Sequence, residues 1–166
     1  MSLFNDSWAE MSPCRTYRYA LGRRVSSASG RVLFTLLNPS KADEEKNDPT
    51  LTRGMGFTRF WGFGELVYCN LYGYRSTDSA QLWKTADPIG PLNDETIARF
   101  ARSATLIVCG WGRQPKATDR AKDVVRLLRS FGQIHHLGLN NDGSPKHPLY
   151  LPSTTQPTLW FEPLPT

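Results

Sequence analysis

Short apolar runs alternate along this chain with segments in which apolar residues recur at helical spacing. Continuous apolar runs of strand length are typical of strands covered on both faces of a parallel sheet, and they occupy 31–37, 65–71 and 105–109. Weaker strand patterns follow at 15–21 and 133–137, and helical spacing occurs at 50–61, 93–103 and 117–131. This alternation predicts an α/β fold in which helices cover both faces of a mainly parallel sheet.

The whole chain is predicted to form a single domain. Its 166 residues are close to the usual size of one domain, and neither a repeat nor a long linker divides them. We expect a core over about 14–152, with peripheral termini. The apolar run at 31–37 is far shorter than the ~20 residues that span a bilayer, so no membrane association is expected.

Three scattered cysteines and a positive charge complete the general picture. Cys14, Cys69 and Cys109 fit neither a disulfide framework nor a metal site, which favours the reducing cytoplasm. Twenty Lys and Arg against fifteen Asp and Glu give a net charge of +5. Such an excess favours an anionic partner such as a nucleotide or nucleic acid, although many soluble proteins carry it without binding either.

Polar or glycine-rich segments follow three of the predicted strands. In open α/β sheets, ligands bind outside the carboxyl ends of the strands. That rule selects 38–40 (Asn-Pro-Ser), the segment beginning at Asn70, and 110–112 (Gly-Trp-Gly).

The two asparagines each allow a functional and a structural interpretation. Asn38 can position a water molecule but cannot deprotonate it, or it can simply make a turn before Pro39. The Asn70 amide offers one donor and one acceptor to a base edge, with Tyr72 stacking on a ring and Arg75 binding a phosphate. In the alternative, the tyrosines belong to the core and Arg75 is a solvated loop residue.

Histidines and acidic residues supply the remaining candidate chemistry. His147 precedes a proline and apolar neighbours, which suggests a fixed loop, although a lone loop histidine is more often a capping residue. Metal binding is not expected, because His135 and His136 are isolated from other ligand types, and the sequence shows no phosphate-loop or dinucleotide motif for a cofactor. The acidic residues after Asn38, at 43–45 and 48, could supply a general base, although such a charge run is usually a solvated face. Asp48 or Thr50 is a candidate cap of the helix that starts there.

Several motifs resemble those of an uncharacterised bacterial family catalogued as domain of unknown function 1643. They are LLNPSKAD followed by NDPT, then CNLYGYRSTD, CGWG and HPLYLP, and the resemblance runs from about Cys14 to Pro152.

A more distant resemblance is to the uracil-DNA glycosylase superfamily, which implies a three-layer α/β/α sandwich. Asn38-Pro39 is similar to the Asn-Pro pair of one branch's catalytic loop, Asn70 to a base-reading asparagine, and His147-Pro148 to a late His-Pro motif. The chain departs from that pattern, because Leu36-Leu37 replace the usual glycine and no carboxylate stands at position 38. Its cysteines also do not form the cluster site of some branches. Fold kinship alone does not transfer activity.

The leading hypothesis is a protein that binds a nucleobase or nucleotide at the strand ends and, if it is an enzyme, hydrolyses an N-glycosidic bond. Asn38 would hold the water and His147 would stabilise charge on the departing base. The other expected contacts are to the base or nucleotide, from Pro39, Ser40, Asn70, Tyr72, Trp111 and Tyr150, and to phosphate, from Arg53, Arg75 and Lys146.

Two other hypotheses remain open. One is a catalytically inactive nucleotide or nucleic-acid binding module. The other is a protein-interaction domain with a surface formed by Trp8, Trp61, Trp83 and Trp160. The sequence does not indicate the base, the strand state of a nucleic acid or the oligomeric state.

Overall fold

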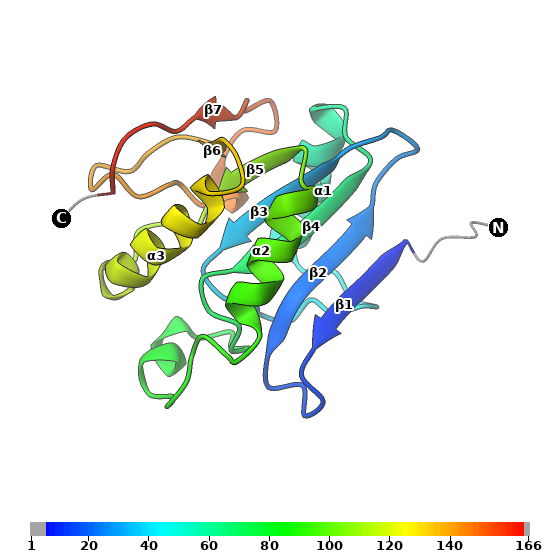
Figure 1. The fold of residues 1–166 in the computed structure, drawn as a ribbon. Helices are drawn as coiled ribbons and strands as arrows, with labels where there is room; N and C mark the ends of the chain where they lie inside the picture. Colours follow the sequence, from blue (N-terminus) through cyan, green and yellow to red (C-terminus); the bar gives the residue numbers. More distant parts are fainter. Residues whose placement is uncertain (1–5, 165–166) are drawn as a thin grey trace.

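A seven-stranded mixed sheet with helices packed against it forms the protein (Figure 1). The computed structural model describes residues 6–164. The strands are β1 (Ser7–Met11), β2 (Arg18–Arg24), β3 (Arg31–Leu36), β4 (Glu65–Asn70), β5 (Leu106–Cys109), β6 (Ile134–His136) and β7 (Thr158–Leu159). The α-helices are α1 (Pro49–Phe60), α2 (Asn93–Ser103) and α3 (Thr118–Arg129), and the short 3-10 helices are η1 (Ser79–Trp83), η2 (Pro115–Ala117) and η3 (Pro148–Tyr150).

The strand order is β1-β2-β4-β3-β5-β6-β7, with parallel strands only in the centre. β4, β3, β5 and β6 pair in parallel, whereas β1–β2, β2–β4 and β6–β7 are antiparallel. The predicted α/β class is therefore confirmed, but the expected mainly parallel sheet was wrong, because half of its pairings are antiparallel. Antiparallel neighbours need only short connections, so both sheet edges form without crossover helices.

Alternating side chains of the central strands enter two separate apolar clusters. Val32 and Phe34 of β3 pack with Leu51 and Phe57 of α1. The intervening Leu33, with neighbours on β4 and β5, packs in the cluster that contains α2 and α3. Figure 1 shows α2 and α3 together in front of the sheet. Both faces of the central strands are thus buried, which explains their continuous apolar runs.

Helix α1 begins at a strong capping signal. The Asp48 carboxylate accepts a hydrogen bond from the Leu51 N–H at 2.8 Å, and Pro49 occupies the first helical position. Gly54 lets the helix approach β4 closely, because a Cβ there would lie 2.0 Å from the Tyr68 hydroxyl oxygen. No helix within residues 6–164 is long and apolar enough to cross a membrane.

The main disagreements with the sequence prediction lie towards the ends of the chain. The strand expected at 15–21 runs instead from Arg18 to Arg24, since Tyr17 makes only an isolated bridge with Tyr74. β1 and β7 lie outside the expected core of 14–152 and form the two edges of the sheet. Their sequences lack a strand pattern, and they are held by pairing with β2 and β6. All three cysteines are free.

Candidate functional site

A cavity of about 360 Å³ opens at the carboxyl ends of β3, β4 and β5. The chain leaves β3 through α1 towards β4 and later places β5 on the other side of β3. Such a switch point is the usual ligand position in open α/β sheets, and this volume is within the range of small-molecule sites. The polar or glycine lining residues are Arg18, Asn38, Ser40, Asp48, Thr50, Tyr68, Asn70, Gly112, Arg113, Gln114 and His147, and the apolar ones are Leu21, Leu36, Leu37, Ala42 and Trp111.

Asn70, the last residue of β4, lines this cavity with an unpaired amide. Its side chain is 1% exposed, and Nδ2 has no hydrogen-bond partner among the described residues. Its backbone is held firmly, because Asn93 Nδ2 donates to the Asn70 carbonyl at 2.9 Å. A buried amide nitrogen without a partner costs stability unless a ligand or a water molecule satisfies it.

Asn38 follows β3 and fixes the neighbouring loop. Its Nδ2 donates to the carbonyl oxygens of Pro39 at 3.1 Å and Ser76 at 2.9 Å. The Ser76 N–H returns a bond to the Pro39 carbonyl at 2.9 Å. Because both amide hydrogens are used, Oδ1 is the atom of Asn38 left to accept a hydrogen bond from a water or ligand.

His147 is positioned by the glycine-rich segment after β5. The Gly112 N–H donates to the Pro145 carbonyl at 2.9 Å, and a Cβ on Gly110 would lie 3.1 Å from Pro148. His147 Nδ1 accepts from the Leu149 N–H at 3.2 Å, which places the proton of the neutral ring on Nε2. Burial lowers the pKa of His147, and the charge of Asp48 opposes that shift. The ring is therefore neutral at pH 7 and offers Nε2–H as a donor.

Asp48 is the only carboxylate among the residues that line this cavity. One of its oxygens caps α1, as described above, and the other accepts from the Ser40 hydroxyl at 3.2 Å. Asp48 thus both caps helix α1 and lines the cavity.

Arg18 brings a buried positive charge to the cavity from β2. The pairing register of β1 with β2 shifts at Met11, so that both Arg18 and Tyr19 lie opposite one step of β1. This bulge places Arg18 at the cavity together with Leu21, although strict alternation would put them on opposite faces. Arg18 Nη1 donates to the Ala42 carbonyl at 2.7 Å.

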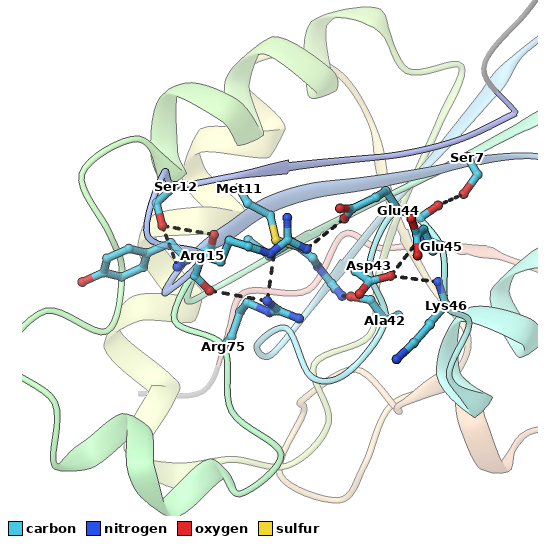
Figure 2. A network of polar contacts seen from close by, with 12 residues as sticks. Ser7, Met11, Ser12, Arg15, Ala42, Asp43, Glu44, Glu45, Lys46 and Arg75 are labelled. Carbon is cyan, nitrogen blue, oxygen red and sulfur yellow. Dashed lines mark hydrogen bonds and ion pairs between the residues drawn. The ribbon is translucent and has the colours of Figure 1, made fainter.

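The segment at 42–46 begins at Ala42, which lines the cavity, and is tied to β1 and to the loop between β1 and β2 (Figure 2). Arg15 Nη2 forms an ion pair with Glu44 at 3.0 Å, and the Ser7 hydroxyl donates to the Glu44 carbonyl. Asp43 accepts from the backbone N–H groups of Glu45 and Lys46. Side-chain contacts therefore order a segment beside the cavity that has no regular secondary structure.

The structure brings together five of the predicted site residues and separates six others. Asn38, Ser40, Asn70, Trp111 and His147 line the cavity. Tyr72 packs against Trp83 in the α2/α3 core, Pro39 is buried behind Asn38, and Tyr150 is 86% exposed on η3. Arg53 donates to the Leu151 carbonyl, Arg75 donates to the Arg15 carbonyl, and exposed Lys146 lies against Gly138. None of these six lines the cavity.

One family model matches this chain. It is described as a protein of unknown function (DUF1643) and covers residues 18–149. The chain belongs to this family. No curated protein and no solved structure matches it.

The DUF1643 segment contains the whole candidate site. It begins at Arg18 and ends at Leu149, so every residue that lines the cavity lies within it. The edge strands β1 and β7 lie outside the DUF1643 match.

Six polar residues of the DUF1643 site were not predicted as binding residues: Arg18, Asp48, Thr50, Tyr68, Arg113 and Gln114. Asp48 carries a visible signal, the Asp-Pro pair, which indicates a helix cap, and its carboxylate is also one of the candidate general bases after Asn38. Gln114 lies just beyond the segment at 110–112, and a longer window after β5 would have included it. Among the described residues, no group of three or more His, Cys, Asp and Glu side chains could hold a metal ion.

Proposed function

We propose that this DUF1643 protein binds the nucleobase of a nucleotide or nucleic acid in the cavity at the strand ends. The observation that carries this proposal is the unpaired, buried amide of Asn70, which lines the same cavity as Asn38 and His147. An amide offers a donor and an acceptor side by side, as the edge of a nucleobase requires. The cavity volume also suits a ligand of this size.

We further propose that the bound ligand is hydrolysed at its N-glycosidic bond. Asn38 Oδ1 would accept a hydrogen bond from the attacking water, and His147 Nε2–H would donate to the base. The C1′–N bond breaks with its electron pair on the base, the water oxygen bonds to C1′, and Asp48 receives the proton that the water loses. That proton then passes to the base nitrogen, so that the products are the free base and the sugar hemiacetal.

Kinship with the uracil-DNA glycosylase superfamily is part of this proposal. The Asn38-Pro39 loop, Asn70 at a later strand end and the His147-Pro148 motif occur in the same chain order in both. The gathering of these three side chains at one cavity supports the kinship.

A nucleotide-binding module without hydrolysis is the second candidate, favoured by the surroundings of Asp48. Both carboxylate oxygens already accept hydrogen bonds, from the Leu51 N–H and the Ser40 hydroxyl. A carboxylate engaged in this way has fewer lone pairs free to contact an attacking water molecule. The interaction-domain hypothesis has less support. None of its four tryptophans is an exposed side chain, and each packs against another aromatic ring of the fold.

A neighbouring groove would suit the backbone of a polynucleotide. It shares Ser40 with the cavity and is lined by four cationic side chains and one acidic one: Arg15, Lys41, Lys46, Arg75 and Asp43. Binding of labelled oligonucleotides across a salt series tests this version, since phosphate contacts weaken steeply as salt rises. Absence of salt-dependent binding restricts the ligand to a mononucleotide or smaller molecule.

Release of free base tests the chemical step. Nucleosides, nucleotides and oligonucleotides are incubated with the wild type, Asn38→Ala and His147→Ala, and released base is separated by chromatography. We expect release by the wild type and a loss of about 100-fold or more in each variant. Equal release by all three proteins would show that the active site lies elsewhere, and binding without release would favour the inactive module.

A further inference from the structure

Arg18 is a buried cation without an ion-pair partner. Its side chain is 3% exposed, and Nη1 is its only nitrogen with a side-chain hydrogen bond, the one to the Ala42 carbonyl. Nε has no hydrogen-bond partner among the described residues. No carboxylate within residues 6–164 lies within 4.0 Å of this guanidinium. Four of its five N–H hydrogens therefore have no partner in that part of the chain.

Such an arrangement has a cost in folding free energy. A buried charge is normally paired, because the attraction of an opposite charge must offset the lost hydration. Burial lowers the pKa of Arg18 to about 10, with the charge of Asp48 acting in the opposite direction. The guanidinium therefore remains protonated at pH 7, and Asp48, the carboxylate that lines the same cavity, forms no ion pair with it within 4.0 Å.

Arg23 on the same strand shows what a purely structural arginine does here. It is similarly buried, at 4% exposed. Its guanidinium donates to Asn47 Oδ1 and to the carbonyl oxygens of Gly22, Asp43 and Lys46. Arg23 thus uses its donors to hold the 42–47 segment, and it does not line the cavity. Arg18 makes only one side-chain hydrogen bond to the same segment. Anchoring that segment therefore does not account for the burial of its guanidinium.

We propose that Arg18 binds an oxyanion of the ligand, a phosphate or a carboxylate, inside this cavity. The Asn70 amide and the His147 Nε2–H are neutral donors that line the same space. The planar guanidinium fork suits bidentate contact with two oxygens of such a group. The assignment of the oxyanion to the phosphate of a nucleotide rests on the proposed function, whereas the anion site itself rests on Arg18 alone.

Calorimetric binding of matched ligands tests the site. The common nucleosides, their 5′-monophosphates, inorganic phosphate and acetate are titrated into the wild type, Arg18→Met and Arg23→Met. Arg23→Met is the matched control, since it removes a buried arginine that lies on the same strand and contacts the same 42–47 segment. Arg18→Lys is included because it keeps the positive charge but lacks the planar guanidinium that can contact two oxygens. Circular dichroism and thermal unfolding verify that each variant folds.

We expect at least one monophosphate to bind the wild type about tenfold or more tightly than its nucleoside, with inorganic phosphate as a competitor. Arg18→Met abolishes that difference, Arg18→Lys reduces it, and Arg23→Met preserves it. If Arg18→Met does not fold, competition by inorganic phosphate in the wild type and the Arg18→Lys result decide the matter.

The remaining outcomes separate the two proposals. Equal affinity of nucleoside and monophosphate for the wild type overturns the anion site and leaves the proposed function standing. Arg18-dependent binding of phosphate or acetate, with no contribution from any nucleoside, supports the anion site and overturns the nucleobase assignment. Failure of every ligand to bind contradicts both.

Discussion

Arg18 and Asn70 line one cavity from the neighbouring strands β2 and β4, and each has a buried nitrogen without a hydrogen-bond partner in residues 6–164. Their segments are joined directly, since the Arg18 N–H donates to the Gly73 carbonyl at 2.9 Å. Two buried donors without partners, at the edge of the sheet where the parallel strands end, lower the free energy of unfolding. They are explained together if a ligand with acceptor oxygens occupies the cavity.

Replacement of Asn70 by leucine is predicted to leave stability unchanged or to raise it. Within residues 6–164 the Asn70 side chain makes no hydrogen bond that leucine would lose, and its buried Nδ2 carries a desolvation cost of about 1–3 kcal/mol. The matched variant Asn93→Leu removes two bonds to the backbone carbonyls of Asn70 and Leu71 and should cost on the order of 1–3 kcal/mol. Denaturant unfolding measures both variants, and a loss in Asn70→Leu as large as that in Asn93→Leu would contradict a binding role.

Two glycines of α1 are predicted to respond oppositely to alanine. Gly56→Ala should stabilise the protein by about 1 kcal/mol, because nothing lies within 4 Å of the added Cβ and alanine favours the helix. Gly54→Ala should destabilise it by ~1–3 kcal/mol despite the same helical gain, since the Cβ would meet the buried Tyr68 ring. Thermal unfolding of the two variants tests this, and equal stabilisation would show that α1 does not pack closely on Tyr68.

The sequence indicated this region only in part. Helical spacing over 50–61 predicted α1 to within one residue at each end. The different roles of Gly54 and Gly56 depend on the packing of Tyr68, which lies on β4 and is distant in the sequence. The continuous apolar runs predicted β3, β4 and β5 well, because both faces of these strands are buried.

The strand-end rule placed Asn38 and Asn70 at one edge of the sheet, but it could not reveal Arg18. The position of that side chain depends on the shift in register against β1, a strand whose sequence, SWAEM, has no distinctive pattern. Tyr72 failed as a binding residue for a related reason. Beyond the end of β4 its backbone N–H bonds to the Leu37 carbonyl, and its ring packs in the α2/α3 core.

Stability is predicted to fall as the pH decreases below about 6.5, partly through His147. The native pKa of this ring is lowered by burial, so the unfolded chain binds protons that the native state excludes. The stabilising contribution is complete above the unfolded pKa of about 6.5 and is lost at lower pH. His136, whose pKa is also lowered by burial, adds to the effect.

His147→Asn isolates the His147 part of this pH dependence. Asparagine can still accept the hydrogen bond from the Leu149 N–H, but it cannot be protonated. Thermal unfolding from pH 5 to pH 8 should show a shallower acid slope in the variant than in the wild type, with the remainder due to His136. Identical slopes would mean that the His147 ring binds protons as readily in the native state as in the unfolded chain.

Asp48→Asn is predicted to separate folding from chemistry. Asparagine caps helices about as well as aspartate, so α1 should persist and the free energy of unfolding should change by less than about 1 kcal/mol. An amide cannot accept the proton of the attacking water, so base release should fall about 100-fold or more. Substrate binding is retained in this variant. Unchanged release would remove Asp48 from the reaction.

The most direct test of the central claim is equilibrium binding of a panel of nucleosides and their 5′-monophosphates to the wild type and to Asn70→Leu. The account predicts saturable binding of at least one compound to the wild type, with one site per chain. Affinity should be about tenfold or more weaker in a folded Asn70→Leu variant, because the base loses its amide partner. Absence of binding to the wild type, or equal affinity for the two proteins, would contradict a nucleobase site at Asn70.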